Sequence, residues 1–173
     1  LGRPPTAEPG IMVTMLHKVG ARKPYVVKDA VCWKNIRKYA AGACRSRERR
    51  HVLGLALMAQ EAECEAMVFV RDQDGDKKRE SDIEDAIDEI PKVIGDIKSA
   101  GGVAIHSIDA WCLAFLGQEK TELLNRPKEK LKASGIESTV ERVGCVRQAR
   151  LKDVADDAKS LKRWLERARC LLQ

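Results

Sequence analysis

Three aspartates occupy alternate positions at the end of an apolar run. The stretch "MVFVRDQDGD" carries Asp72, Asp74 and Asp76, with Gly75 between the last two. Carboxylates two residues apart in a turn can direct their oxygen atoms at one hard cation, and glycine lets the backbone bend sharply there. Mg²⁺ is commonly held by one or two carboxylates and completed by water and phosphate. The spacing therefore predicts a site for Mg²⁺ (or Mn²⁺) at these aspartates.

The same stretch resembles three other kinds of segment. An EF-hand loop beginning at Asp72 would need glycine at its sixth position and glutamate at its twelfth, where this chain has Lys77 and Ile83, so calcium of that type is excluded. A haloacid-dehalogenase-like phosphatase also has DxDG after a strand, but its lysine motif is not recognisable here and the following segment is too short. A solvated turn, in which aspartates simply favour the bend, stays open.

A second polar group follows the apolar stretch "GGVAIH". His106, Ser107 and Asp109 are the residue types of a hydrolytic triad. Residues so close together on one turn rarely reach one another in the required geometry. We therefore expect Ser107 to cap the next helix, and we expect Asp109 to complete the site of Asp72 and Asp74.

Charge is unevenly distributed along the chain. Residues 17–59 carry eleven Lys/Arg and two Asp/Glu, a balance of +9, whereas residues 60–100 carry six and thirteen, a balance of −7. Such segregation suits a polyanion held beside a metal ion, although solvated helix faces or an acidic partner would also account for it. Phosphate contacts dominate non-specific nucleic-acid affinity. The predicted contacts are Lys34, Arg37, Lys38, Arg45, Arg47, Arg49, Arg50, Lys77 and Lys78.

Short apolar strands must position these residues. Residues 65–70 form a continuous apolar run of the kind buried on both faces of a parallel sheet, and residues 101–106 form another. Residues 23–33 are rich in β-branched and aromatic side chains and predict a third strand. Ligands bind outside the carboxyl ends of such strands, where Asp72 is placed.

Helical patterns alternate with these strands. We expect a first helix with apolar positions at 11–19, capped by Thr6 and with Glu8 near the positive end of its dipole. Further helices are expected at 47–63, at 81–97 (capped by Ser81 and interrupted at Pro91), after Ser107, at 119–133 and at 151–172. The last is strongly amphipathic, and Leu161, Trp164 and Leu165 are predicted to pack against the core or against a partner. The fold class is α/β, a mostly parallel sheet flanked by helices with a helical C-terminal part.

Composition limits the class of protein. A chain of 173 residues with 44% hydrophobic content can bury a core, and its longest apolar run, residues 52–59, is too short to cross a membrane. The first residues lack the pattern of a signal peptide. Six cysteines without metal-ligand spacing indicate reduced, mostly buried thiols. We therefore expect a cytoplasmic protein without membrane contact.

The motifs together carry a family resemblance. "MVFVRDQDGD" followed by "GVAIHSIDAWCLAFLG" resembles the Toprim-like domains related to OLD-family nucleases, which include small uncharacterised bacterial proteins often encoded beside ATPases in defence islands. "GRPPTAEPGIMVTMLHKVG" is similar to the glycine turn and helix that follow the first Toprim strand, and "RPKEKLK" and "SLKRWLERA" extend the likeness. The resemblance implies a Toprim-like α/β core at 1–117 and a helical extension at 118–173.

The resemblance also implies an activity. Asp72 and Asp74 match the DxD that binds Mg²⁺ for phosphodiester cleavage, and Asp109 matches the acidic position before tryptophan. The implied function is a nuclease-like, DNA-processing subunit in anti-phage defence, part of an oligomer or of a complex with an ATPase. The catalytic glutamate of the family is not found, because Leu1 precedes Gly2 and Glu8 lies a turn later. A non-catalytic module that docks on an ATPase or on its own copy is the second hypothesis.

Overall fold

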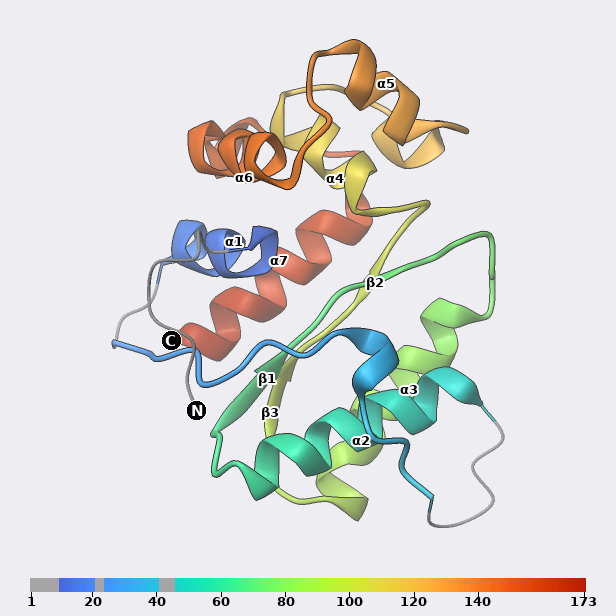
Figure 1. Cartoon of the computed structure of the whole chain (residues 1–173), viewed down its shortest axis with the longest axis vertical. Helices are drawn as coiled ribbons and strands as arrows, with labels where there is room; N and C mark the ends of the chain where they lie inside the picture. The colour runs from blue at the N-terminus through green and yellow to red at the C-terminus, as the bar shows by residue number, and fades with distance from the viewer. Residues whose placement is uncertain (1–9, 21–23, 41–45) are drawn as a thin grey trace.

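The computed structural model describes residues 10–20, 24–40 and 46–173, in which helices surround a narrow parallel ribbon (Figure 1). The helices are α1 (Ile11–Val19), α2 (Arg47–Glu61), α3 (Arg79–Val93), α4 (Ile108–Phe115), α5 (Pro127–Ala133), α6 (Thr139–Gln148) and α7 (Lys159–Leu172). Short 3-10 turns are η1 (Trp33–Asn35), η2 (Thr121–Leu123) and η3 (Leu151–Asp153). The strands are β1 (Ala66–Val68), β2 (Arg71–Asp72), β3 (Lys98–Ala100) and β4 (Val103–Ala104).

The four strands form one continuous ribbon. β1 pairs in parallel with β3, and β2 pairs in parallel with β4. Between them, the Phe69 N–H donates to the Ala100 carbonyl at 3.1 Å and the Arg71 N–H to the Gly102 carbonyl at 3.0 Å, so one ladder leads into the next. The two predicted strands on either side of α3 are therefore confirmed, with the second beginning earlier than expected.

Helices cover both faces of this ribbon. Met67 and Phe69 point into a core formed with α2 and α3. Val68 and Val70, which alternate with them, pack against a second core formed by α1, α4, α6 and α7. Figure 1 shows α2 and α3 on one side of the ribbon and α1 and α7 on the other. Parallel strands buried among helices, with a helical C-terminal part, confirm the coarse prediction of an α/β-like fold.

The sheet is smaller than expected. Among the described residues each sheet has two strands, so the molecule is mostly helical. The predicted strand at 23–33 is wrong over 24–33, which has no regular structure before η1. Val26 is 87% exposed, so no sheet neighbour covers this segment. Strand propensity mostly reflects packing on a half-buried surface, and such a surface is missing here.

Helix α7 lies within the protein's own core. Leu161, Trp164 and Leu165 are buried with Met15 and Trp111. The Trp164 Nε1–H also donates to the Phe69 carbonyl at 3.1 Å. Of the two predicted alternatives, packing against the core is confirmed, whereas packing of these three side chains on a partner is wrong. This core contains residues from both sides of position 117.

The start of α7 differs from the prediction of a helix over 151–172. α7 begins at Lys159, and residues 151–153 form η3 instead. One oxygen of the buried Glu122 accepts hydrogen bonds from the N–H groups of Ser160 (2.8 Å) and Leu161 (3.3 Å). The side chain that satisfies these first amides thus comes from η2, about forty residues earlier in the chain.

Other helix boundaries also differ from the sequence patterns. The predicted helix 119–133 is η2 followed by α5, which starts anew at Pro127. Helix α6 was not predicted, although Ser138 and Glu141 form a capping box at its start. Helix α3 begins at Arg79 without a Ser81 cap, and Pro91 lies within its last turn. The predicted cap at position 6 and the predicted role of position 8 near the start of this helix fall outside the described residues.

Two further expectations concern the environment of the protein. No helix in the described ranges is both long and apolar enough to span a membrane. The five described cysteines are free thiols, of which only Cys112 and Cys145 are buried. Burial raises the pKa of Cys112 to about 12, which makes this thiol unreactive.

Candidate functional site at the carboxyl end of the ribbon

Asp72 ends strand β2 beside the start of α4. Its Oδ1 accepts a hydrogen bond from the Ile108 N–H at 2.8 Å. Ser107 makes no side-chain cap, so the predicted cap of α4 is wrong and Asp72 supplies one from the neighbouring strand. Burial raises the pKa of Asp72 above its ordinary value of 3.8, and the nearby Asp74 and Asp109 carboxylates raise it further. The bond from Ile108 and the Arg71 charge oppose this rise.

Asp109 lies in the first turn of α4 and is buried. Arg142 of α6 donates to its Oδ1 from Nε at 2.8 Å and to the Glu137 carbonyl from Nη1 at 2.9 Å. This pair fixes α6 against α4. The structure brings the three predicted catalytic aspartates to one end of the ribbon. The carboxylates of Asp74 and Asp109 are close enough to Asp72 to contribute to its raised pKa.

The backbone at this end is strained. Asp74 has φ 49°, Gly75 φ 76° and His106 φ 61°. Positive φ is uncommon for residues other than glycine, and here two such residues face each other, with the Asp74 N–H 3.5 Å from the His106 carbonyl. Strained backbone persists where the surroundings hold it, and it often marks functional sites.

Arg79 holds the turn through hydrogen bonds to its backbone and to one of its carboxylates. Its Nη1 donates to the carbonyls of Asp72 (2.6 Å) and Gln73 (2.7 Å) and to Asp74 Oδ2 (2.9 Å). Its Nε donates to Glu48 Oε1 at 3.0 Å, and both Arg79 and Glu48 are buried. One guanidinium thus fixes both carbonyls and one carboxylate of the DQD segment.

Sequence reasoning missed Arg71, Arg79 and Glu48. The two arginines flank the aspartates in the chain, and that proximity was the available signal. Glu48 belongs to the basic segment and pairs with Arg79, 31 positions away, so no local pattern points to it. The charges that neutralise the aspartates in the structure therefore come largely from the protein itself.

Asp76 takes a different direction. Its Oδ1 accepts from the Lys78 N–H at 3.1 Å, and its Oδ2 lies 3.9 Å from Arg79 Nη2. Within the described ranges, no three His, Cys, Asp or Glu side chains form a group that could hold a metal ion. The trio of Asp72, Asp74 and Asp76 is accordingly not assembled around a common point.

A smaller donor set fits a divalent cation. The two carboxylates Asp72 and Asp74 offer only oxygen atoms, which are the ligands that Mg²⁺ and Mn²⁺ prefer. Asp74 is half-exposed, with 53% of its side chain accessible, so an ion can reach it. One or two carboxylates completed by water and phosphate suffice for Mg²⁺.

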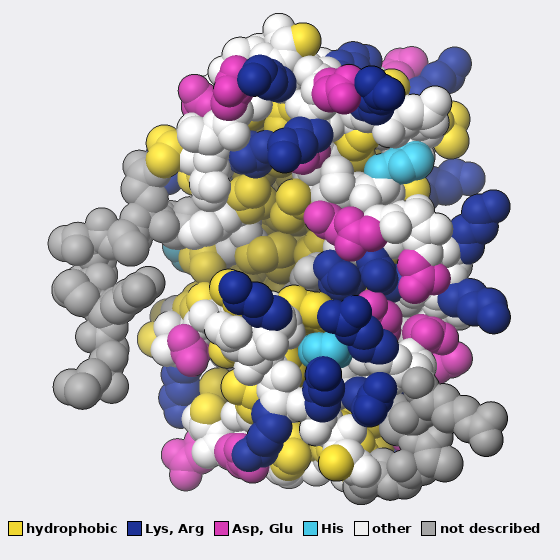
Figure 2. Space-filling view, turned by 45° about the vertical axis from the view of Figure 1, so that its right-hand side comes forward, with side chains coloured by type: hydrophobic (Ala, Val, Ile, Leu, Met, Phe, Trp, Pro, Cys, Tyr) yellow, Lys and Arg dark blue, Asp and Glu magenta, His cyan; other side chains and the backbone are white. Residues whose placement is uncertain are grey.

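The predicted nucleic-acid contacts are only partly available. Arg37 pairs with Glu61, Arg49 pairs with Glu89, and position 45 lies outside the described residues. Arg50 is half-buried, and its Nε is buried without a partner in the described part. The remaining predicted contacts are exposed and form no ion pair among the described residues: Lys34, Lys38, Arg47, Lys77 and Lys78. Figure 2 shows Lys and Arg side chains in several groups on one face, mixed with Asp and Glu, around a hollow with a hydrophobic floor.

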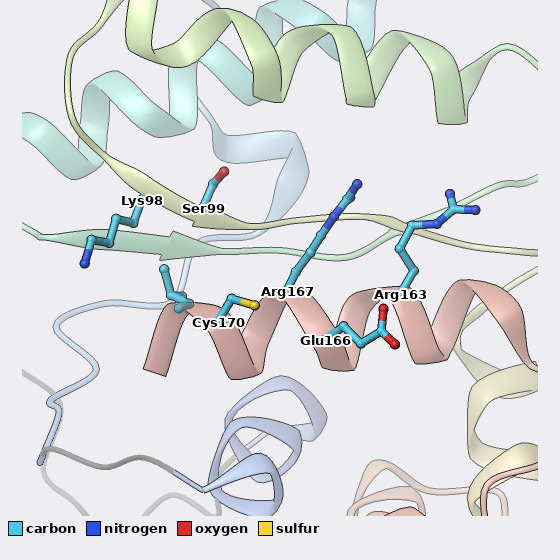
Figure 3. Close-up of a pocket in the computed structure, with 7 residues that line it drawn as sticks. Lys98, Ser99, Arg163, Glu166, Arg167 and Cys170 are labelled. Carbon is cyan, nitrogen blue, oxygen red and sulfur yellow. The ribbon is translucent and has the colours of Figure 1, made fainter. Parts of the chain in front are cut away.

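A separate open groove lies between α7 and β3 (Figure 3). Its volume is about 470 Å³, and Lys98, Arg163, Arg167 and Cys170 are among its lining residues. Both arginines are already engaged, Arg163 by Glu80 and Arg167 by Glu84. Lys98 begins β3, so this groove lies at the opposite end of the ribbon from Asp72.

Comparisons with protein-family models, with curated proteins and with solved structures found no match to this chain. The residues at the carboxyl end of the ribbon therefore provide the evidence for a function.

Proposed function

We propose that this chain is a Toprim-like subunit that processes nucleic acid with the help of Mg²⁺ or Mn²⁺. The observation that carries the proposal is the position of Asp72. It is a partly buried carboxylate at the carboxyl end of parallel strands, and its pKa is raised by burial and by Asp74 and Asp109. Perturbed carboxylates at such a strand end are typical of functional sites.

Each residue has a role in this proposal. Asp72 and Asp74 would hold the ion, and Asp109, fixed by Arg142, would orient the site. When bound, the ion would polarise the scissile phosphate and stabilise negative charge that develops on it. The exposed Lys77 and Lys78, which directly follow the turn, would contact backbone phosphates of the polymer.

Wider features of the proposal come from the resemblance alone. DNA as the polymer, an ATPase as the partner, a role in anti-phage defence, an oligomeric or complexed state and a cytoplasmic location all belong to the proposal. Among these features, the nucleic-acid polymer alone has support from the surface, through the exposed Lys77 and Lys78 beside the acidic strand end. Electrostatic attraction brings a polyanion to such a surface without base-specific contacts.

The decisive experiment compares cleavage by the purified protein and by Asp72→Asn. Supercoiled DNA, linear DNA and RNA are incubated with Mg²⁺ or Mn²⁺. Asn keeps an oxygen to accept the Ile108 hydrogen bond but loses the charge, so we expect at least about 100-fold slower cleavage. Asp88→Asn, an exposed change on α3, is the matched control. Equal cleavage by the wild type and Asp72→Asn would refute the proposal.

One observation favours a non-catalytic interaction module instead. Asp74 Oδ2 is already shared by Arg79 at 2.9 Å and Arg71 at 3.3 Å, so this carboxylate is neutralised without an ion. On this hypothesis Asp72→Asn leaves assembly unchanged and no variant cleaves. Assembly is tested by light scattering with exposed α7 residues changed, Glu166→Lys and Arg169→Glu, because Leu161 and Trp164 are buried.

A further inference from the structure

Glu48 and Arg71 form an unusually loose pair for two side chains whose facing atoms are both buried. Glu48 is 4% exposed, and its Oε1 is bonded to Arg79. Its Oε2 is buried and has no hydrogen-bond partner among the described residues, and the same is true of Arg71 Nε. These two atoms are 3.7 Å apart. A buried donor and acceptor left unpaired at this separation cost free energy that a small movement would recover.

The second contact of the Arg71 guanidinium, with Asp74, explains why its Nε does not come within hydrogen-bond distance of Glu48. Its Nη1 lies 3.3 Å from Asp74 Oδ2, and its guanidinium carbon lies 5.8 Å from the centre of the Trp33 ring. Arg71 is thus shared between a buried carboxylate on α2 and the half-exposed carboxylate of the turn. Its contact with Asp74 is an ion pair at 3.3 Å, whereas its Nε remains 3.7 Å from Glu48 Oε2, beyond hydrogen-bond distance.

Arg79 is held differently, although it contacts the same two carboxylates. It donates to two backbone carbonyls at 2.6 and 2.7 Å and to Glu48 at 3.0 Å, in addition to Asp74. Losing Asp74 would leave three of these bonds in place. Arg79 is therefore a fixed support of the turn, whereas Arg71 is free to change partner.

We propose that Arg71 is a displaceable counter-charge for Asp74. When a divalent cation is taken up at Asp72 and Asp74, Arg71 leaves Asp74, closes onto Glu48 and so changes its position next to Trp33. The inference rests on the proposed function, because it concerns the regulation of that same site. A guanidinium beside an incoming dication is repelled, and the unpaired Glu48 oxygen provides the place to which it moves.

The test measures Mn²⁺ binding to the full chain by calorimetry, without nucleic acid. Arg71→Gln removes the competing charge, so we expect Mn²⁺ to bind about tenfold more tightly than to the wild type, a factor reasonable for one nearby charge. Arg71→Lys keeps the charge and is expected to stay within about threefold of the wild type. Arg163→Gln on α7 removes a surface ion pair with Glu80 of α3 and is expected to leave Mn²⁺ binding unchanged.

The outcomes separate this inference from the proposed function. Mn²⁺ binding that is equally tight in the wild type and in Arg71→Gln overturns the proposal that Arg71 is a counter-charge for Asp74, and it leaves the proposed metal site intact. Absence of binding in every variant overturns both. Tighter binding in Arg71→Gln but not in Arg71→Lys supports both.

A second measurement keeps the inference testable if Arg71→Gln does not fold. Mg²⁺ is titrated into the wild type and into Trp33→Phe, and the difference in tryptophan emission isolates Trp33. Movement of Arg71 next to the ring is expected to change this difference signal as the ion binds. A difference signal that stays constant while calorimetry shows Mg²⁺ binding overturns the proposal.

Discussion

The Oδ1 atom of Asp72 links two elements of the fold. Oδ1 accepts from the first turn of α4 and so joins the end of one strand to the helix after the other. Because this bond already fixes the carboxylate, the group needs no further ordering to present its remaining lone pairs to a ligand. Such preorganisation is what the proposed metal site requires.

The raised pKa of Asp72 leads to a prediction about pH. The folded state binds this proton more tightly than the unfolded chain does. The resulting stabilisation is fully present below the ordinary value of 3.8 and is lost as the pH rises through the raised pKa. Asp72→Asn cannot ionise, so we expect it to be more stable than the wild type at neutral pH, with the difference shrinking on acidification.

Urea midpoints measured over a range of pH check this prediction, with Asp88→Asn as the exposed control. A constant difference between Asp72→Asn and the wild type at all pH values would show that burial does not perturb Asp72.

Local sequence signals located some of these residues and missed others. The alternate spacing of Asp72 and Asp74 after an apolar run was sufficient to place them at a strand end and in the turn after it, because both are local features. Ser107 was wrongly expected to cap α4, because the cap comes from a strand 36 positions earlier. Glu48 carries no local signal for the same reason. Partners that are distant in sequence decide these cases, and a single sequence does not display them.

Two glycines, one in α2 and one in α6, permit a matched test of how closely the helices pack against their neighbours. At Gly54 in α2, an added Cβ would lie 1.9 Å from the Arg37 carbonyl oxygen, so the helix and the preceding segment would have to separate. We expect Gly54→Ala to destabilise the protein by about 1–3 kcal/mol. At Gly144 in α6 nothing lies within 4 Å, and Gly144→Ala is expected to stabilise it by about 0.5–1 kcal/mol.

Thermal unfolding of the two variants against the wild type measures both effects. Stabilisation by Gly54→Ala would mean that α2 does not approach the Arg37 carbonyl so closely.

Periodicity predicted the helices better than the strands. α1, α2, α3 and α4 follow their apolar patterns, because each buries one face against the ribbon or against another helix. Residues 24–33 have the composition of a strand but no sheet neighbour, and composition alone does not reveal how many neighbours a strand has. The same limitation explains why the extent of the sheet was overestimated.

At the scale of the whole molecule, α7 connects the two cores. Trp164 lies in the core with α1 and α4 and bonds to the carbonyl of Phe69, whose ring lies in the other core. Arg167 pairs with Glu84 of α3 and donates to the Gly101 carbonyl at 2.8 Å. These contacts imply that the two sides of the ribbon unfold together.

Trp164→Phe tests this coupling. Phe fills much of the site but removes the donor to the Phe69 carbonyl, so a loss of about 1–3 kcal/mol is expected. Hydrogen exchange should then quicken by the same factor in α2 and α3 as in α6, which lie on opposite sides of the ribbon. Faster exchange confined to α7 would show that the two cores unfold separately.

The pairing of β1 with β3 has a consequence for how the chain is made. Ala66 pairs with Lys98, so the first strand pair of the ribbon cannot form until the ribosome has released α3. The outer edge of the ribbon at Gly101 is covered by α7, which is synthesised more than fifty residues later. A nascent chain that has reached only α6 therefore holds a ribbon with one apolar face poorly covered. Such an intermediate is prone to aggregation. Slow translation just before residue 159 would prolong this vulnerable stage, whereas rapid synthesis of α7 would shorten it.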